Sequence, residues 1–176
     1  MRFSHVLGPA NGPSRARYLF VGEAPGRLGA GRSGVPFLGD ESGRRFAALL
    51  AHVGLRRQEV FVTNAVLCNP VDGRGRNRRP RAAEVKRCAA FLRAQLAAVD
   101  PAVVVALGGV ALAALGRIEP HGLRLSEDCA RPVAWLDRRL VALYHPGRRA
   151  LVHRADTRQR EDWLSLLSVG SAAARV

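Results

Sequence analysis

RYLFVGEAPGRLGAGRSGVPFLGDESGRRF, residues 17–46, is the stretch from which the fold is predicted. Its residues 18–21 are a short apolar run, typical of a buried strand. A glycine-rich loop, residues 22–40, follows this run. After the loop, apolar residues recur at helical spacing, at Phe46, Leu49, Leu50 and Val53. Because open α/β sheets bind ligands where a parallel strand ends, the loop is a candidate ligand site.

The glycine-rich loop lacks the lysine of a phosphate-binding P-loop. No Lys-Ser or Lys-Thr pair follows its glycines, and Glu23 would repel a phosphate. A loop of this length and glycine content is uncommon without a function. The loop also contains a single aromatic residue, Phe37. We therefore expect a ligand site that uses Glu23 and Phe37.

The rest of the chain alternates between strand and helix patterns. Strands are predicted at residues 60–63 and 103–107 and as a pair at 133–136 and 140–143, and helices near 41–53, 82–98, 110–115 and 156–168. Trp163, Leu166 and Leu167 are expected to face inward from the last helix. We predict an α/β fold, a three-layer α/β/α sandwich around a short, mainly parallel four-stranded sheet. Residues 1–176 are predicted to form a single domain in which residues 1–16 are a flexible arm.

The charge of the chain favours a polyanionic partner. It has 28 basic and 14 acidic residues and a formal net charge of +14. A GC-rich coding bias would explain arginine in place of lysine, but not twice as many bases as acids. An arginine loop, residues 71–81, has five arginines and almost no apolar residue. Such a loop is either solvated or in contact with an anion, and nucleic acid binding is favoured by counterion release.

The chain has neither the long apolar segment of a membrane span nor the apolar core of a secretory signal. Its three cysteines are Cys68, Cys88 and Cys129, without a C-x-x-C pair. An odd number of cysteines fits a reducing compartment better than a disulfide framework. We expect a cytoplasmic protein, a monomer that does not bind membranes.

Four chemically useful side chains come just after predicted strands or in the loop that follows one. These are Glu23, Phe37, Asn64 and His145. Each alone has an ordinary alternative: a histidine is often structural, an asparagine after a strand often caps a turn, and Phe37 could pack beneath its loop. Since the carboxyl ends of parallel strands lie at one edge, we expect all four in one site.

Several motifs resemble the uracil-DNA glycosylase superfamily. They are Gly22-Glu23-Ala24-Pro25-Gly26, Pro36-Phe37, Thr63-Asn64-Ala65-Val66-Leu67-Cys68, Asn77 and Pro80 with Glu84, Leu107-Gly108, and Tyr144-His145-Pro146. The branch that carries GE(A/G)PG and an iron–sulfur cluster is the most similar. The run from Gly31 to Asp40 also resembles the NRTG…FxGD segment of a second branch. The resemblance covers most of residues 17–163.

The resemblance implies removal of uracil from DNA by flipping the base into a pocket. Phe37 would stack on the uracil, Asn64 would bond its O4 and N3–H, and His145 would donate to O2 as negative charge gathers there. Glu23 or its loop would orient water or stabilise the cationic sugar. The implied catalytic residues are Glu23, Asn64 and His145. The implied substrate-binding residues are Gly22, Ala24, Pro25, Gly26, Phe37, Asn64 and His145, and the DNA-binding residues are Arg74, Arg76, Arg78, Arg79, Arg148 and Arg149.

The sequence departs from the resemblance in three ways. Only Cys68 and Cys88 match cluster positions, so we expect no 4Fe-4S cluster, metal or other cofactor. Positions 27–34 contain no carboxylate, and the last motif has Gly147 where serine is usual. The predicted function is a monofunctional uracil-DNA glycosylase that starts base excision repair on DNA containing uracil. The alternatives are a glycosylase for another deaminated base, such as hypoxanthine, and a catalytically weak relative that binds abasic or single-stranded DNA.

Overall fold

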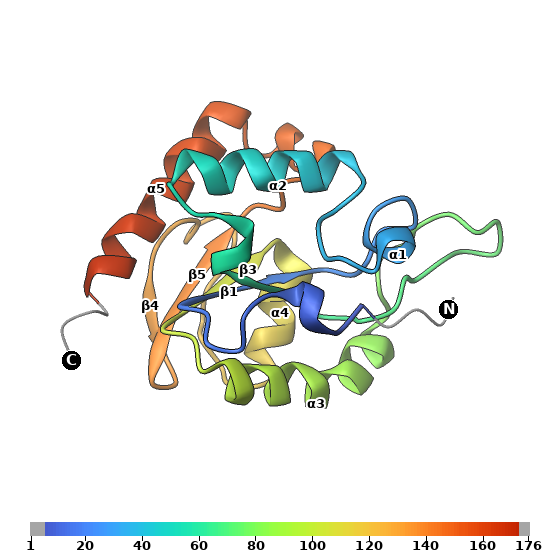
Figure 1. Ribbon diagram of the computed structural model, residues 1–176, viewed down its shortest axis with the longest axis horizontal. Helices are drawn as coiled ribbons and strands as arrows, with labels where there is room; N and C mark the ends of the chain where they lie inside the picture. The colour runs from blue at the N-terminus through green and yellow to red at the C-terminus, as the bar shows by residue number, and fades with distance from the viewer. Residues whose placement is uncertain (1–5, 173–176) are drawn as a thin grey trace.

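The computed structural model describes residues 6–172 and has three layers (Figure 1). The sheet consists of β1 (Tyr18–Gly22), β2 (Phe61–Asn64), β3 (Val103–Leu107), β4 (Val133–Trp135) and β5 (Arg138–Leu143), in the order β2-β1-β3-β5-β4. Strands β2, β1, β3 and β5 are parallel, and β4 is antiparallel to β5. The α/β/α sandwich is confirmed, but the sheet has five strands, not the predicted four, because both members of the strand pair join it.

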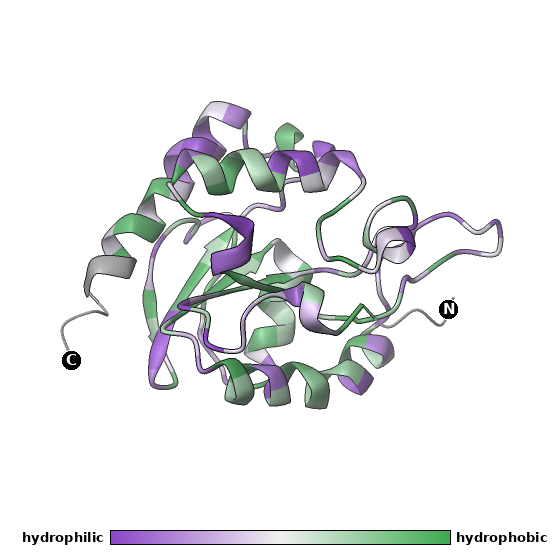
Figure 2. Ribbon diagram, in the orientation of Figure 1, coloured by the Kyte–Doolittle hydropathy of each residue, from purple (hydrophilic) through white to green (hydrophobic). Residues whose placement is uncertain are grey.

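Helices cover both faces of the sheet. On one face lie α2 (Glu41–His52) and α5 (Asp156–Ala172), and on the other lie α3 (Ala82–Val99) and α4 (Gly109–Gly116). The strands alternate between the two cores: Phe20 and Val105 pack toward α2 and α5, while Leu19 and Val104 pack toward α3 and α4. All four side chains are fully buried. A sheet covered on both faces needs strands that are apolar on both faces, and Figure 2 shows these strands in green. Short helices complete the chain: η1 (Pro9–Asn11), α1 (Ala30–Ser33), η2 (Arg57–Glu59) and η3 (Arg148–Val152).

The last helix differs from the sequence-based expectation at one position. Trp163 and Leu166 are fully buried, as predicted, but Leu167 is half exposed. The buried row of α5 continues from Leu166 to Val169, three residues later. Leu167 lies about 100° around the helix from Leu166 and therefore faces away from the sheet.

Residues 6–16 pack against the edge of the sheet, so the predicted flexible arm is wrong for this part of the chain. Val6 and Asn11 are buried, and the Asn11 amide donates a 2.8 Å hydrogen bond to the carbonyl of Val62 in β2. Gly12 has φ +133, and a Cβ there would lie 2.2 Å from the carbonyl oxygen of Val60, so only glycine fits. Residues 1–5 lie outside the described part of the chain.

The register of the parallel strands aligns their carboxyl ends. Gly22 pairs with Asn64, and Leu107 pairs with Leu143. The segments that follow these residues therefore leave the sheet at one edge, where the chain order changes direction between β1 and β3. No helix within residues 6–172 is long and apolar enough to cross a membrane.

Candidate active site

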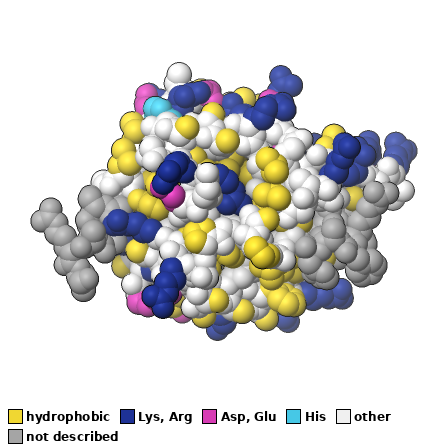
Figure 3. Space-filling model, in the orientation of Figure 1, with side chains coloured by type: hydrophobic (Ala, Val, Ile, Leu, Met, Phe, Trp, Pro, Cys, Tyr) yellow, Lys and Arg dark blue, Asp and Glu magenta, His cyan; other side chains and the backbone are white. Residues whose placement is uncertain are grey.

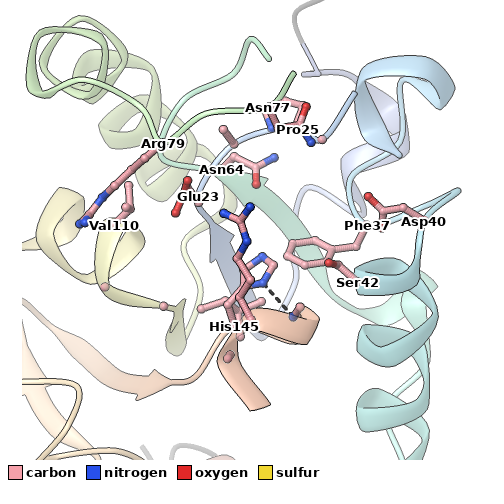
Figure 4. A pocket seen from close by; sticks show the side chains of 18 of the residues that line it. Glu23, Pro25, Phe37, Asp40, Ser42, Asn64, Asn77, Arg79, Val110 and His145 are labelled. Carbon is pink, nitrogen blue, oxygen red and sulfur yellow. Dashed lines mark hydrogen bonds between the residues drawn. The ribbon is translucent and has the colours of Figure 1, made fainter. Parts of the chain in front are cut away.

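A cavity of about 770 Å³ opens at this carboxyl edge. Its walls come from the glycine-rich loop, the end of β2, the arginine loop, the start of α4 and the segment after β5. Figure 4 shows Asn64, Phe37 and His145 around one space, with Glu23 and Phe37 on opposite sides of Asn64. The four side chains predicted to converge are thus in one cavity.

Asn64 presents a free amide to this cavity. Asn64 is only 3% exposed, and its side chain has no hydrogen-bond partner within residues 6–172. Its amide lines the cavity rather than being sealed in the core, so a ligand or water in the cavity can bond it. Asn64 therefore offers one acceptor and two donor hydrogens to a ligand.

Gly22 allows Asn64 and Phe37 to approach each other. A Cβ at Gly22 would lie 2.5 Å from Oδ1 of Asn64 and 2.9 Å from Cε2 of Phe37. Gly22 does not border the cavity itself. It lies beneath the two side chains, so its missing side chain is what allows the amide and the ring to share one place.

Phe37 is held firmly in position. Its ring stacks on Phe46 of α2 with centroids 4.6 Å apart and lies 5.5 Å from the ring of His145. The backbone has φ +55, a conformation that a phenylalanine adopts only when its surroundings impose it. A Cβ at Gly43 would lie 2.3 Å from the Phe37 carbonyl oxygen, so the first turn of α2 fits closely beneath this residue.

His145 is oriented by the turn that follows it. The backbone N–H of Gly147 donates a 2.9 Å hydrogen bond to Nδ1, drawn dashed in Figure 4. Burial lowers the pKa of His145 to about 4, although the negative charge of Asp40 acts in the opposite direction. The imidazole is therefore neutral at pH 7, and because Nδ1 accepts, its proton is on Nε2. The neutral imidazole, whose Nε2–H has no partner among the described residues, can donate to a ligand in the cavity.

Glu23 is a half-buried carboxylate at the end of β1. Burial raises its pKa, and the positive charges of Arg79 and Arg149 partly oppose this effect. Its backbone carbonyl accepts a hydrogen bond from the N–H of Val66, which fixes the loop next to β2. A carboxylate with a raised pKa in a cavity is a candidate for acid–base chemistry.

A second carboxylate, Asp40, also lines the cavity and was not among the site residues predicted from the sequence. Its Oδ1 accepts from the N–H of Gly43 at 2.9 Å and so caps α2. Oδ2 would be 2.2 Å from a Cβ at Gly29 and 3.1 Å from one at Gly26. The two glycines thus leave room for the Asp40 side chain. The sequence does not predict this, because the three residues come together only when the loop folds.

The remaining predicted loop residues have different positions in the site. Ala24, Pro25 and Gly26 line the cavity, as predicted for substrate-binding residues.

Residues 29–34, GAGRSG, have the spacing of a dinucleotide-binding fingerprint. They form the four-residue helix α1 and its flanks, well after β1 has ended, so the strand–turn–helix context of that fingerprint is missing.

The six arginines predicted to bind DNA divide into two groups. Arg79, Arg149, Arg148 and Arg78 line the cavity, but Arg74 and Arg76 do not. Arg78 is bound to both carboxylate oxygens of Glu84, at 2.8 and 2.6 Å, and Arg76 pairs with Asp72 at 2.9 Å. Arg148 lies 3.4 Å from Glu41. Lys and Arg side chains are spread over the face shown in Figure 3 rather than gathered at one place.

The cysteines do not form a cluster site. Cys68 and Cys88 are close enough that Cys88 contributes to the raised pKa of Cys68, while Cys129 packs against the opposite core and donates to Asp162 at 3.3 Å. A 4Fe–4S cluster usually needs four thiolates. Within residues 6–172 no three His, Cys, Asp or Glu side chains are grouped to hold a metal ion. The described residues therefore do not fit an iron–sulfur cluster.

The fold and cavity define an α/β protein with a cavity at the carboxyl ends of its parallel strands, the place where open α/β sheets bind ligands. Residues 9–167 match the family described as the Uracil DNA glycosylase superfamily. The chain is 33% identical over 156 residues to the type-4 uracil-DNA glycosylase of Archaeoglobus fulgidus, covering 86% of this chain and 74% of that protein. It is 33% identical over 147 residues to the type-4 enzyme of Thermotoga maritima, covering 83% and 71%. It is 35% identical over 157 residues to the type-5 uracil-DNA glycosylase of Thermus thermophilus, covering 80% and 68%. The chain therefore belongs to the uracil-DNA glycosylase superfamily.

Proposed function

We propose that this protein hydrolyses the N-glycosidic bond of uracil in DNA after the base has flipped into the cavity. The observation that supports this most directly is the Asn64 amide, which lines the cavity without a hydrogen-bond partner among the described residues, beside the Phe37 ring and the neutral His145. A uracil needs an aromatic face, an amide that bonds O4 and N3–H, and a donor to O2. These three side chains provide one of each.

The neutral His145 suits this reaction because charge develops on the leaving base. As the glycosidic bond breaks, negative charge gathers on O2 of the uracil, and a hydrogen bond from Nε2–H stabilises it. The positive charge that develops on the sugar is stabilised by the Glu23 carboxylate, which also orients the attacking water. Hydrolysis then gives free uracil and an abasic sugar, and no metal or cofactor is needed for these steps.

DNA binding in this proposal uses the arginines around the cavity. Arg79 and Arg149 have no acidic partner among the described residues apart from the charge of Glu23, so they are available to phosphates. Arg148 and Arg149, just after the His145 turn, would enter or brace the gap left by the flipped base. In a plot of the logarithm of the binding constant against the logarithm of the salt concentration, each phosphate contact should make the slope more negative by about 0.9.

The deciding experiment is product analysis on matched oligonucleotides that contain uracil, thymine or hypoxanthine. We expect release of free uracil, an abasic product, and no release of thymine. Release of hypoxanthine in preference to uracil would identify a different deaminated base as the substrate. Failure to release any base would refute the glycosylase proposal.

A binding role without turnover is the second candidate. It is favoured by the lack of any carboxylate between positions 27 and 34, where relatives of the GE(A/G)PG branch usually have acids. Tight binding to an abasic or single-stranded oligonucleotide without base release would support it. The retained arrangement of Asn64, Phe37 and His145 opposes it, since phosphate binding alone requires none of these side chains.

A further inference from the structure

We propose that Asn77 is a positioning residue that joins the arginine loop to the glycine-rich loop, so that a phosphate bound by Arg79 fixes the placement of Glu23. The inference rests on the proposed function, since it concerns how DNA binding acts on the cavity. Asn77 lies in the arginine loop, and Glu23 lies 54 positions earlier in the chain.

The contact between the two loops is made by one oxygen atom. Oδ1 of Asn77 accepts from the backbone N–H of Arg27 at 3.0 Å and from the amide of Asn69 at 3.1 Å. The same Asn69 nitrogen donates to the carbonyl of Pro25 at 2.5 Å. Asn69 is only 3% exposed, so its bond to Pro25 is shielded from water, whereas Asn77 and Arg27 lie at the surface. Asn77 and Asn69 therefore fix the residues on either side of Gly26, Arg27 through its N–H and Pro25 through its carbonyl.

The arginine loop is rigid at its base. Val71 and Asn77 form an antiparallel bridge, and the N–H of Arg78 donates to the carbonyl of Pro70 at 3.1 Å. Arg78 then binds Glu84 through both carboxylate oxygens, and Glu84 also accepts from the N–H of Arg81 at 2.8 Å. Arg79 lies between these two anchored residues. Its backbone is therefore fixed relative to Asn77.

The glycine-rich loop is fixed at its other end by β2. The carbonyls of Gly22 and Glu23 accept from the N–H groups of Ala65 and Val66 at 2.8 and 3.1 Å. Between this anchor and the Asn77 bridge lie only Ala24, Pro25 and Gly26. Glu23 is thus placed by β2 on one side and by the arginine loop on the other.

The side chain of Asn77 acts only as an acceptor in this bridge, which makes a sharp test possible. Its amide nitrogen has no hydrogen-bond partner within residues 6–172. Asn77→Asp keeps the accepting oxygen, whereas Asn77→Ala removes it. Gln58→Ala removes an exposed amide far from the cavity and serves as the matched control.

The experiment is a double-mutant cycle with Asn77→Ala and Arg79→Ala. Uracil release (kcat and KM separately) and binding to an oligonucleotide with a stable abasic-site analogue are measured for each protein, with thermal unfolding alongside. We expect Asn77→Ala to lower kcat about tenfold, as small misplacements of catalytic groups do. We expect Asn77→Asp to recover most of this loss and Gln58→Ala to match the wild type.

The cycle separates positioning from a general loss of structure. If Asn77 transmits the phosphate contact, Arg79→Ala costs several-fold less in the Asn77→Ala background than in the wild type. Additive effects, or an Asn77→Asp protein no better than Asn77→Ala, would overturn the inference. If the wild type released no base, the proposed function would fail, and the binding arm of the cycle would still decide whether Asn77 and Arg79 are coupled.

Discussion

The backbone N–H of Gly147 donates to Nδ1 of His145, and this bond decides where the imidazole carries its proton. A histidine whose Nδ1 accepts cannot have its neutral proton there, so Nε2 is the donor. Burial keeps the ring neutral by lowering its pKa to about 4. The pKa of His145 in the folded protein is thus below its value of about 6.5 in the unfolded chain. The contribution of this residue to the free energy of unfolding is therefore greatest above pH 6.5, where the ring is neutral in both states, and is lost as the pH falls toward 4.

His145→Ala should reduce kcat for uracil release by about two orders of magnitude or more, because it removes the donor to the developing negative charge. In the wild type, titration of His145 should not change the rate between pH 6 and pH 8. Single-turnover kinetics across this range provide the measurement. His52→Ala, which removes an exposed histidine of α2, is the control and should keep the wild-type rate. A wild-type rate for His145→Ala would refute the role of this residue.

Glu23 should determine the acid limb of the pH–rate profile. Burial raises its pKa, so the carboxylate that stabilises the sugar cation is lost as the pH falls through a value above 4.5. Glu23→Gln should lower kcat and abolish this limb. Arg79→Ala removes a positive charge that opposes the shift, so it should move the limb to higher pH. A limb that persisted unchanged in Glu23→Gln would assign it to another group.

Gly22→Ala should damage the site more than the fold. The added Cβ would meet Oδ1 of Asn64 at 2.5 Å and the Phe37 ring at 2.9 Å, and both groups must move. We expect kcat to fall at least tenfold, with a loss of about 1–3 kcal/mol in unfolding free energy from overpacking. Gly8→Ala, where a Cβ meets nothing within 4 Å, is the control. Equal activity of the two variants would show that Asn64 and Phe37 tolerate displacement.

Glu84 should make the stability of the protein depend on pH in the acid range. Its hydrogen bonds to Arg78 lower its pKa to about 2, below the unfolded value of 4.5. The stabilisation is therefore complete above pH 4.5 and is lost as the pH falls toward 2. Thermal melts of Glu84→Gln and wild type between pH 3 and pH 6 test this. The difference in Tm should be largest at pH 6 and shrink at pH 3, and a constant difference would contradict the pairing.

Hydrophobic periodicity and residue order were enough to predict the layers and the convergence of the site. The strand over residues 103–107 was predicted with its observed bounds, since a continuous buried run leaves few alternatives. Asn64 and His145 were predicted to share an edge because parallel strands align their carboxyl ends.

Features that depend on pairs of distant residues could not be predicted in this way. The packing of residues 6–16 depends on the bond between Asn11 and the Val62 carbonyl, 51 positions apart. The arginine loop looked uniformly charged, but Glu84 binds Arg78 and leaves Arg79 free of an ion pair among the described residues. Asp40 fits the cavity because Gly26 and Gly29 lie beside it in the folded loop. Sequence spacing contains none of these partnerships.

The segment before β1 covers part of the exposed edge of the sheet. Strand β2 is the outermost strand on its side of the sheet, and an unpaired outer strand is a template on which other chains can assemble. The Asn11 amide donates a hydrogen bond to the carbonyl of Val62 in this strand, and the backbone N–H of Val6 donates to the carbonyl of Leu67, just after the strand. A shortened chain that began at β1 would leave these groups open, and we expect it to aggregate more readily than the longer chain even with every cavity residue intact.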